Sequence, residues 1–285
     1  LIALGRRAAW TLVTLSDRRA RRDPVTGVLE GAEPIALGPS DAPKAALLVH
    51  GFIGAGSNFG ELPSKLAERG WRVVAPRLPG HGTSPTDLES TTPDELVEAV
   101  RTELRSLRAA HEHVAVIGHS LGGSLGVLAV AEDGASALVL GAPFFSIAKP
   151  SWIPIPIRPE TAFDWLKTPR WLRWFYKGHL FMQLKRREAA SEILSYEWVP
   201  TKGVSTLIEL GRRASDPDRL RRIHCPVLWL HAPGDAAADY ASARLALRSL
   251  GGPASAHHSL ALPQSNHQIF FDHDRHTAIR GILEF

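Results

Sequence analysis

Short, almost continuous runs of apolar residues recur along the chain, separated by longer stretches whose apolar residues return every three or four positions. Such runs are typical of strands buried on both faces of a parallel sheet, and such stretches are typical of helices that cover it. The predicted strands are residues 45–50, 71–76, 114–117, 137–140, 227–230 and 257–262. The predicted helices are residues 57–69, 93–110, 121–131 and 239–250.

The alternation of strand and helix predicts the fold class. Strand and helix repeated in this way are typical of an α/β protein with a mostly parallel, doubly wound sheet. The second predicted helix has a clear start, because Thr92 precedes Pro93 and Glu95 stands at the third helical position, as in a capping box. We assign residues 25–143 and 206–285 to this α/β core.

One segment, residues 144–205, interrupts the alternation. It contains no evident buried strand, its first part is rich in proline, and residues 161–187 are predicted to be helical. Five of the eight tryptophans of the chain lie in it: Trp152, Trp165, Trp171, Trp174 and Trp198. We interpret it as a cap inserted at the strand ends, because so much aromatic surface has to be buried against the core, a ligand or a membrane.

Composition and charge narrow the function classes. With 285 residues, 44% of them hydrophobic and 22% charged, the chain has the make-up of an average soluble globular protein. Arginines cluster in a basic N-terminal segment, residues 1–24, which also has an apolar side. This segment is therefore either a solvated helix face or a contact for acidic lipid headgroups. No nucleic-acid-binding module accompanies the arginines, so nucleic acid is not expected as a partner.

The cysteine content and the lengths of the apolar runs exclude further structural classes. The single cysteine rules out an internal disulfide, and no Cys and His spacing indicates a metal site, so neither a metal nor another cofactor is expected. No run approaches the roughly 20 apolar residues that span a bilayer. The chain begins with Leu1, which leaves open that a signal or an anchor has been removed. We expect a cytoplasmic protein, with attachment to a membrane surface as the alternative, and leave the oligomeric state open.

The sequence GHSLG, residues 118–122, stands between a predicted buried strand and a predicted helix. When a nucleophilic serine occupies such a sharp turn, the positions two before and two after it are glycine because side chains would clash there. Gly118 and Gly122 occupy those positions, so Ser120 is predicted to be a nucleophile rather than part of an ordinary turn.

A serine nucleophile needs a base within hydrogen-bond reach and an acid that orients the base. In this arrangement the acid and then the base follow the serine along the chain. Asp235 follows the fifth predicted strand on a glycine-assisted turn, and His267 follows the sixth. Both emerge at the same edge of the sheet as Ser120. Asp239 is a rival acid, which we interpret as a cap of the helix that follows.

Acyl transfer also needs N–H donors aimed at the developing oxyanion. The amide of Leu121, directly after the serine, is one predicted donor, and the amide of Phe52, after the first predicted strand, is the other. We expect substrate contacts from Phe52, His119, Phe144, Trp152 and Trp174.

Five stretches of the chain share their order and rough spacing with a known family. They are LLVHGFIGAG, APRLPGHGTSP, VIGHSLGG, PGD and SNHQIFFD. In these stretches the chain resembles the α/β-hydrolase superfamily, most of all its carboxylesterase and monoacylglycerol-lipase branch. The resemblance implies that Ser120 is the nucleophile, Asp235 the acid and His267 the base, with the amides of Phe52 and Leu121 as the oxyanion hole.

Two parts of the chain depart from the family pattern. Asn266 precedes the histidine where such esterases usually carry glycine, and asparagine is expected to preserve the turn because it tolerates left-handed backbone. After the acid, Ala236, Ala237 and Ala238 replace the usual apolar residues and proline.

The sequence therefore predicts a serine carboxylester hydrolase that cleaves short- to medium-chain acyl esters through an acyl-enzyme. One alternative is a monoacylglycerol or lysophospholipid lipase at a membrane surface. Another is a non-catalytic ligand-binding protein on a hydrolase scaffold. Hydrolysis of amides or lactones uses the same machinery and stays open.

Overall fold

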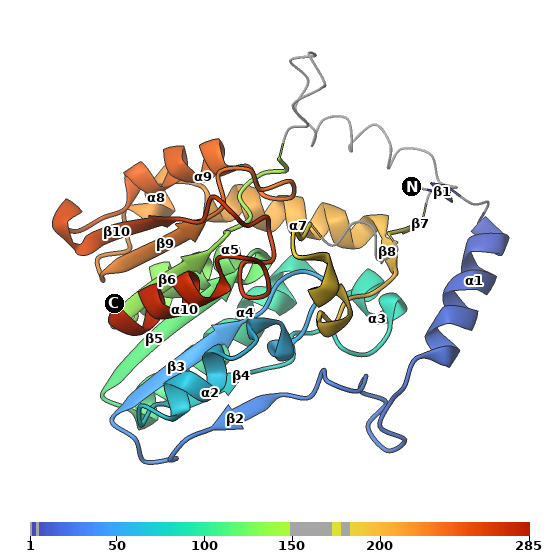
Figure 1. Ribbon diagram of the computed structural model, residues 1–285, viewed down its shortest axis with the longest axis horizontal. Coiled ribbons are helices and arrows are strands. Elements are labelled where there is room, and N and C mark those ends of the chain that lie inside the picture. The colour runs from blue at the N-terminus through green and yellow to red at the C-terminus, as the bar shows by residue number, and fades with distance from the viewer. Residues whose placement is uncertain (1, 4–5, 149–172, 178–182) are drawn as a thin grey trace.

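A seven-stranded sheet forms the centre of the computed structural model, which describes residues 2–3, 6–148, 173–177 and 183–285 (Figure 1). The strand order is β10-β9-β6-β5-β3-β4-β2, and every neighbouring pair is parallel except β2 with β4. The strands are β2 (Ile35–Leu37), β3 (Lys44–Val49), β4 (Arg72–Ala75), β5 (His113–His119), β6 (Ala137–Gly141), β9 (Val227–His231) and β10 (His257–Ala261). The α/β fold class and all six predicted strands are confirmed, whereas the short edge strand β2 was not predicted.

Successive side chains of a strand point to opposite faces of the sheet, so a strand made of apolar residues is apolar on both faces. Helices therefore cover both faces. In β3, Ala45, Leu47 and Val49 belong to one core, and Ala46 and Leu48 belong to the other. Residues of α4, α5, α7, α8 and α9 complete the first core, and residues of α2 and α10 complete the second (Figure 1). These helices are α2 (Leu62–Ala67), α4 (Pro93–Ala110), α5 (Leu121–Asp133), α7 (Thr201–Ala214), α8 (Pro217–Leu220), α9 (Tyr240–Ala246) and α10 (Arg275–Glu284).

Local signals set several helix boundaries. The capping box predicted for α4 is present: Thr92 Oγ1 accepts from the Glu95 amide at 3.3 Å, and Glu95 Oε2 accepts from the Thr92 amide at 2.7 Å. The first predicted helix is divided into the 3-10 helix η1 (Gly56–Phe59) and α2, because Gly60 between them has a φ of 57°. The fourth is likewise divided into α9 and the 3-10 helix η4 (Leu247–Ser249).

The inserted segment contains strands that the sequence did not predict. β7 (Trp174–Tyr176) and β8 (Trp198–Pro200) form an antiparallel sheet with β1 (Ile2–Ala3). The prediction of a helix over residues 161–187 is wrong for the part that contains β7, and most of that range lies outside the described residues. Aromatic residues form strands where a partner strand is present, and local periodicity does not reveal a partner from the other end of the chain.

The N-terminal segment packs against this cap. Helix α1 (Arg6–Arg19) lies beside β7 (Figure 1), and its Val13 is buried against Trp174 and Trp198. Helix α7 leads from β8 back to the core and runs through the expected boundary at residues 205 and 206. The remaining short helices in the described ranges are α3 (Pro85–Ser90), η3 (Arg187–Glu192) and η5 (Ala254–Ala256). Of the helices in the described ranges, none combines the length and the apolar character needed to cross a bilayer.

Candidate active site

Ser120 stands at the turn from β5 into α5 in a conformation that side chains rarely adopt. Its φ is 55°, and a non-glycine residue at positive φ is strained. The backbone around it is tightly packed: a Cβ on Gly122 would lie 1.8 Å from the Val49 carbonyl oxygen, and a Cβ on Gly118 would lie 2.2 Å from the Gly122 oxygen. Glycine is therefore required at both positions, as the GHSLG motif predicts.

Two loops bring an imidazole and a carboxylate to this serine. In the loop after β10, His267 has its Nε2 2.8 Å from Ser120 Oγ and its Nδ1 2.8 Å from Asp235 Oδ2. A carboxylate can only accept, so Nδ1–H donates to Asp235 and Nε2 accepts the hydroxyl hydrogen of Ser120. The His267 carbonyl also accepts from His119 Nε2 at 3.0 Å. The three residues predicted from chain order thus form one buried chain of hydrogen bonds.

Four hydrogen bonds hold the Asp235 carboxylate. Oδ1 accepts from the amides of Ala237 at 2.7 Å and Ala238 at 2.9 Å, and Oδ2 accepts from His231 and His267. Burial acts to raise the pKa of Asp235, but its charge interaction with His267 and the two imidazole hydrogen bonds outweigh burial and hold that pKa below the usual range. The loop donors are backbone amides, so the alanines that depart from the family pattern still bind the acid.

His231 is a second histidine on this carboxylate, and the sequence analysis missed it. Trp229 Nε1 donates to His231 Nδ1 at 3.2 Å, so the hydrogen of the neutral ring is on Nε2, 3.0 Å from Asp235 Oδ2. Trp229 and His231 are alternate residues of β9 and therefore point to the same face of the sheet. The available signal was a histidine at the last strand position before the acid turn.

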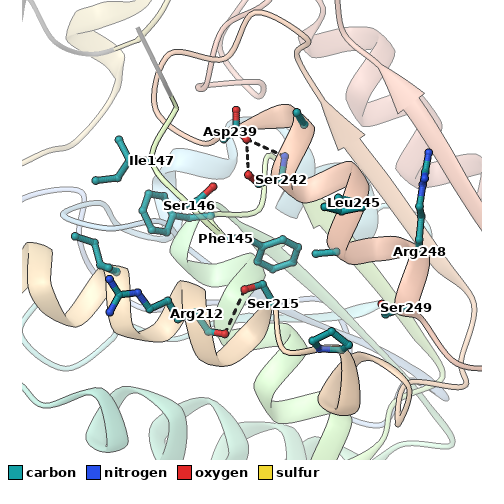
Figure 2. Close-up of a pocket in the computed structure, with 15 residues that line it drawn as sticks. Phe145, Ser146, Ile147, Arg212, Ser215, Asp239, Ser242, Leu245, Arg248 and Ser249 are labelled. Atoms are coloured by element: carbon teal, nitrogen blue, oxygen red, sulfur yellow. Dashed lines mark hydrogen bonds between the residues drawn. The ribbon is translucent and has the colours of Figure 1, made fainter. Parts of the chain in front are cut away.

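Asp239, the rival acid, faces a cavity that Ser120 does not line. It caps α9 by accepting from the Ser242 amide at 2.8 Å and from the Ser242 hydroxyl, as Figure 2 shows. It lines a cavity of about 910 Å³, together with Arg212 and Leu245, and Ser120 does not line this cavity. The interpretation of Asp239 as a helix cap is confirmed, and Asp235 is the acid that faces the imidazole.

Asn266 joins the histidine loop to the acid loop. Its Oδ1 accepts from the amides of Ala236 and His267, both at 2.9 Å, and its own amide donates to Asp272 Oδ2 at 2.7 Å. Asn266 is not among the described residues with positive φ, so the expectation of left-handed backbone at this position is wrong. The side-chain oxygen of Asn266, rather than its backbone conformation, distinguishes it from glycine here.

We expect Asn266→Ala to lower kcat about 10- to 100-fold with little change in KM, because the bond between the two loops sets the approach of His267 to Ser120. Asn266→Asp keeps an acceptor oxygen at the same place and should recover most of the loss. Steady-state kinetics on one ester measure the effect, and thermal unfolding checks that the variants are folded. Wild-type kcat in Asn266→Ala would contradict this role.

The two backbone amides predicted as oxyanion donors have no hydrogen-bond acceptor among the described residues. Leu121 is the first residue of α5, so its amide has no acceptor within the helix. Neither this amide nor that of Phe52 donates a hydrogen bond to any described residue. His50 anchors the Phe52 loop, because its Nδ1 donates to the Gly51 carbonyl at 3.0 Å and its Nε2 accepts from the Leu78 amide at 3.2 Å. Burial above all lowers the pKa of His50 to about 3, so its ring stays neutral.

A pocket of about 570 Å³ leads to the serine. Ser120 and His267 lie in its wall among mostly apolar side chains. Its volume is typical of sites for small organic ligands. No cluster of three or more His, Cys, Asp or Glu side chains that could hold a metal ion occurs in the described part of the chain.

The five residues predicted to contact the substrate fall into three groups. Those that line the pocket are Phe52, His119 and Phe144. Trp174 is not among the described residues that line it; its side chain is buried against Val13 of α1 instead. Neighbouring strand residues point to opposite faces, and Phe175, which the sequence analysis missed, faces the pocket. Trp152 lies outside the described residues.

Comparison with known proteins identifies relatives along most of the chain. Residues 46–279 match the model of the alpha/beta hydrolase family. A thermostable monoacylglycerol lipase from Bacillus sp. (strain H-257) is 29% identical over 259 residues, which cover 90% of this chain and 95% of that protein. A carboxylesterase from Bacillus subtilis (strain 168) is 38% identical over 81 residues, which cover 28% of this chain and 33% of that protein.

Solved structures of other proteins share the fold of this chain. The monoacylglycerol lipase of Paleococcus ferrophilus matches with a TM-score of 0.71 at 21% identity, over 88% of this chain and 96% of that one. A structure from work on LipS and LipT, two metagenome-derived lipolytic enzymes, matches with a TM-score of 0.75 at 23% identity, over 90% of this chain and 98% of that one. At these identities the likeness is one of fold.

Proposed function

This chain belongs to the alpha/beta hydrolase family, and we propose that it hydrolyses carboxylic esters through a serine nucleophile and an acyl-enzyme. The two relatives described above are a lipase and an esterase, and this chain is a hydrolase of that type. The observation that carries the finer proposal is the chain of hydrogen bonds from Ser120 through His267 to Asp235, at the wall of an apolar pocket.

In the proposed reaction His267 takes the proton of Ser120 while Oγ attacks the ester carbonyl carbon. The negative oxygen of the tetrahedral intermediate accepts from the amides of Phe52 and Leu121. The intermediate then expels the alcohol, which His267 protonates, and the acyl group stays on Ser120. Water attacks the acyl-enzyme with His267 as base and releases the acid. Asp235 keeps the imidazole in the required tautomer and stabilises its charged form.

The pocket favours substrates with an apolar acyl chain. Its volume of about 570 Å³ and its apolar walls suit short- to medium-chain esters and monoacylglycerols. An apolar pocket discriminates by only about 1–3 kcal/mol per methylene, so we propose a broad chain-length preference.

A substrate panel tests the proposed function. The purified protein is given p-nitrophenyl esters from acetate to laurate, a monoacylglycerol, an anilide and a lactone. We expect turnover of several esters, with kcat/KM changing gradually with chain length. No turnover of any ester, or turnover of the anilide alone, would overturn the proposal.

A lipase at a membrane surface is the second candidate, and the exposed face of α1 favours it. Leu12 and Leu15, three residues apart on one side of the helix, are 42% and 44% exposed, although each is a large apolar side chain. Arg18 and Arg19 are exposed at the end of the same helix. An apolar helix face beside arginines fits the boundary of an anionic membrane, where each basic residue adds about 1 kcal/mol.

If α1 binds membranes, the double variant Leu12→Gln/Leu15→Gln should lower co-sedimentation with phosphatidylcholine–phosphatidylglycerol vesicles several-fold, because it removes apolar surface that enters the lipid. Leu245→Gln is the matched control, since Leu245 is 66% exposed on α9. The membrane proposal fails if the wild-type protein does not sediment with the vesicles, or if both variants bind as it does.

A further inference from the structure

Lys177 is a cation in the catalytic pocket that the proposed reaction does not use. It follows β7, and no other lysine or arginine is found among the described residues that line the pocket. Its Nζ donates to Ser195 Oγ at 2.7 Å, and Ser195 lines the same pocket. A cationic side chain therefore stands in a wall that is otherwise mostly apolar.

The described residues use only part of the hydrogen-bonding capacity of this ammonium group. An ammonium group has three N–H donors, and Ser195 is the sole described residue that accepts from it. Glu197 favours the charged form of Lys177 through a charge interaction, and its carboxylate accepts from Ser16 Oγ at 3.0 Å. Burial lowers the pKa of Lys177 to about 8, while Glu197 acts to raise it, so most of the ammonium groups are charged at neutral pH. An anion that enters the pocket would accept from N–H donors of Lys177 that Ser195 does not use, in a charge-assisted hydrogen bond.

Ser195, which accepts from Lys177, follows a residue that is held by two hydrogen bonds. Asn58 from η1 donates to the Leu194 carbonyl at 2.9 Å and accepts from the Leu194 amide at 3.0 Å. These two bonds fix the chain beside Ser195 to the core. On the other side, the Lys177 amide donates to the Glu197 carbonyl at 2.7 Å. The ammonium group is thus positioned before any ligand binds, which lowers the entropy that binding costs.

We propose that Lys177 and Ser195 form a subsite for an anionic group of the substrate, so that the favoured esters carry a carboxylate or a phosphate remote from the scissile carbonyl. The subsite deepens the proposed ester hydrolysis and rests on it. The anionic group has two chemical sources: a carboxylate at the end of a dicarboxylic acyl chain, or a phosphate on the alcohol.

Two matched substrate pairs test the subsite. One pair is p-nitrophenyl pentanoate and the p-nitrophenyl monoester of glutaric acid. The other is monolauroylglycerol and its phosphate monoester. For each pair, the ratio of kcat/KM for the anionic member to that for the neutral member is measured in the wild type and in Lys177→Met, Lys177→Arg and Lys202→Met. Lys202 is exposed on α7 and controls for the loss of a positive charge outside the pocket.

We expect the ratio to fall about tenfold or more in Lys177→Met for at least one pair, because a charge-assisted hydrogen bond is lost. Lys177→Arg and Lys202→Met should stay within about threefold of the wild type. A fall in the glutarate pair alone identifies a carboxylate on the acyl side, and a fall in the lauroyl pair alone identifies a phosphate on the alcohol side. Thermal unfolding and labelling of Ser120 by a fluorophosphonate check that Lys177→Met is folded.

The subsite is refuted if both ratios in Lys177→Met stay within about twofold of the wild type, or if Lys202→Met lowers them equally. Either result leaves the proposed function standing as long as the wild type cleaves the neutral esters. Absence of turnover for every ester would refute the proposed function itself.

Discussion

Ser120→Ala should lower kcat for ester hydrolysis by about 10⁴- to 10⁶-fold, with a much smaller change in KM. The methyl group of alanine cannot attack a carbonyl, whereas the pocket and the two oxyanion amides remain. The residual rate then comes from binding and from those amides. Progress curves with a p-nitrophenyl ester at high enzyme concentration measure the loss. A kcat within about tenfold of the wild type would show that another group is the nucleophile.

The strain at Ser120 provides an independent check on the same turn. Alanine retains a Cβ at a φ of 55°, whereas glycine adopts this conformation freely. Ser120→Gly should therefore be as inactive as Ser120→Ala but more stable, by about 1 kcal/mol or roughly 2–4 °C in Tm. Equal Tm values for the two variants would mean that the turn stores no strain.

Asp235→Asn should lower kcat by about 10⁴-fold. The amides of Ala237 and Ala238 donate to Oδ1 of the carboxylate, whereas His231 and His267 both donate to Oδ2. The single oxygen of asparagine accepts from the two amides, which places its NH₂ group at the position of Oδ2, facing His267. The NH₂ group would favour the tautomer of His267 that carries its hydrogen on Nε2, which cannot accept the proton of Ser120. The same kinetic assay measures the loss.

Asp239→Asn is the matched control for this variant. Asparagine caps helices about as well as aspartate, so α9 should be retained, with kcat within about twofold of the wild type and an unchanged Tm. A similar loss in both variants, or more than a tenth of wild-type kcat in Asp235→Asn, would contradict the assignment of Asp235 as the acid.

Much of the site could be predicted because short stretches of sequence specify it. The glycines around Ser120 leave a recognisable pentapeptide, since a Cβ at Gly118 or Gly122 would overlap backbone atoms. Asp235 and His267 were found because parallel strands end at one edge of the sheet, so residues after successive strands meet there. The hydrogen bonds that join Ser120 to His267 and His267 to Asp235 lie where these two rules place them.

The rest depended on contacts between segments that are distant in sequence. Trp174 and Phe175 are equally aromatic, and the pairing of β7 with β8 and β1 decides which of them faces the pocket. From the sequence, Asn266 was expected to matter because asparagine tolerates left-handed backbone. Its side-chain oxygen instead accepts a hydrogen bond from a loop about thirty residues earlier in the chain. Side-chain partners of this kind have no periodicity and leave no local signal.

The proposed hydrolysis depends above all on a covalent intermediate at Ser120, and a label on that residue tests it most directly. The protein is treated with a fluorophosphonate, or stopped during turnover of a p-nitrophenyl ester, then digested and mapped by mass spectrometry. We expect one adduct on the peptide that carries Ser120, and no adduct in Ser120→Ala. An adduct on a different residue, or ester turnover by a protein that the fluorophosphonate neither labels nor inhibits, would contradict the account.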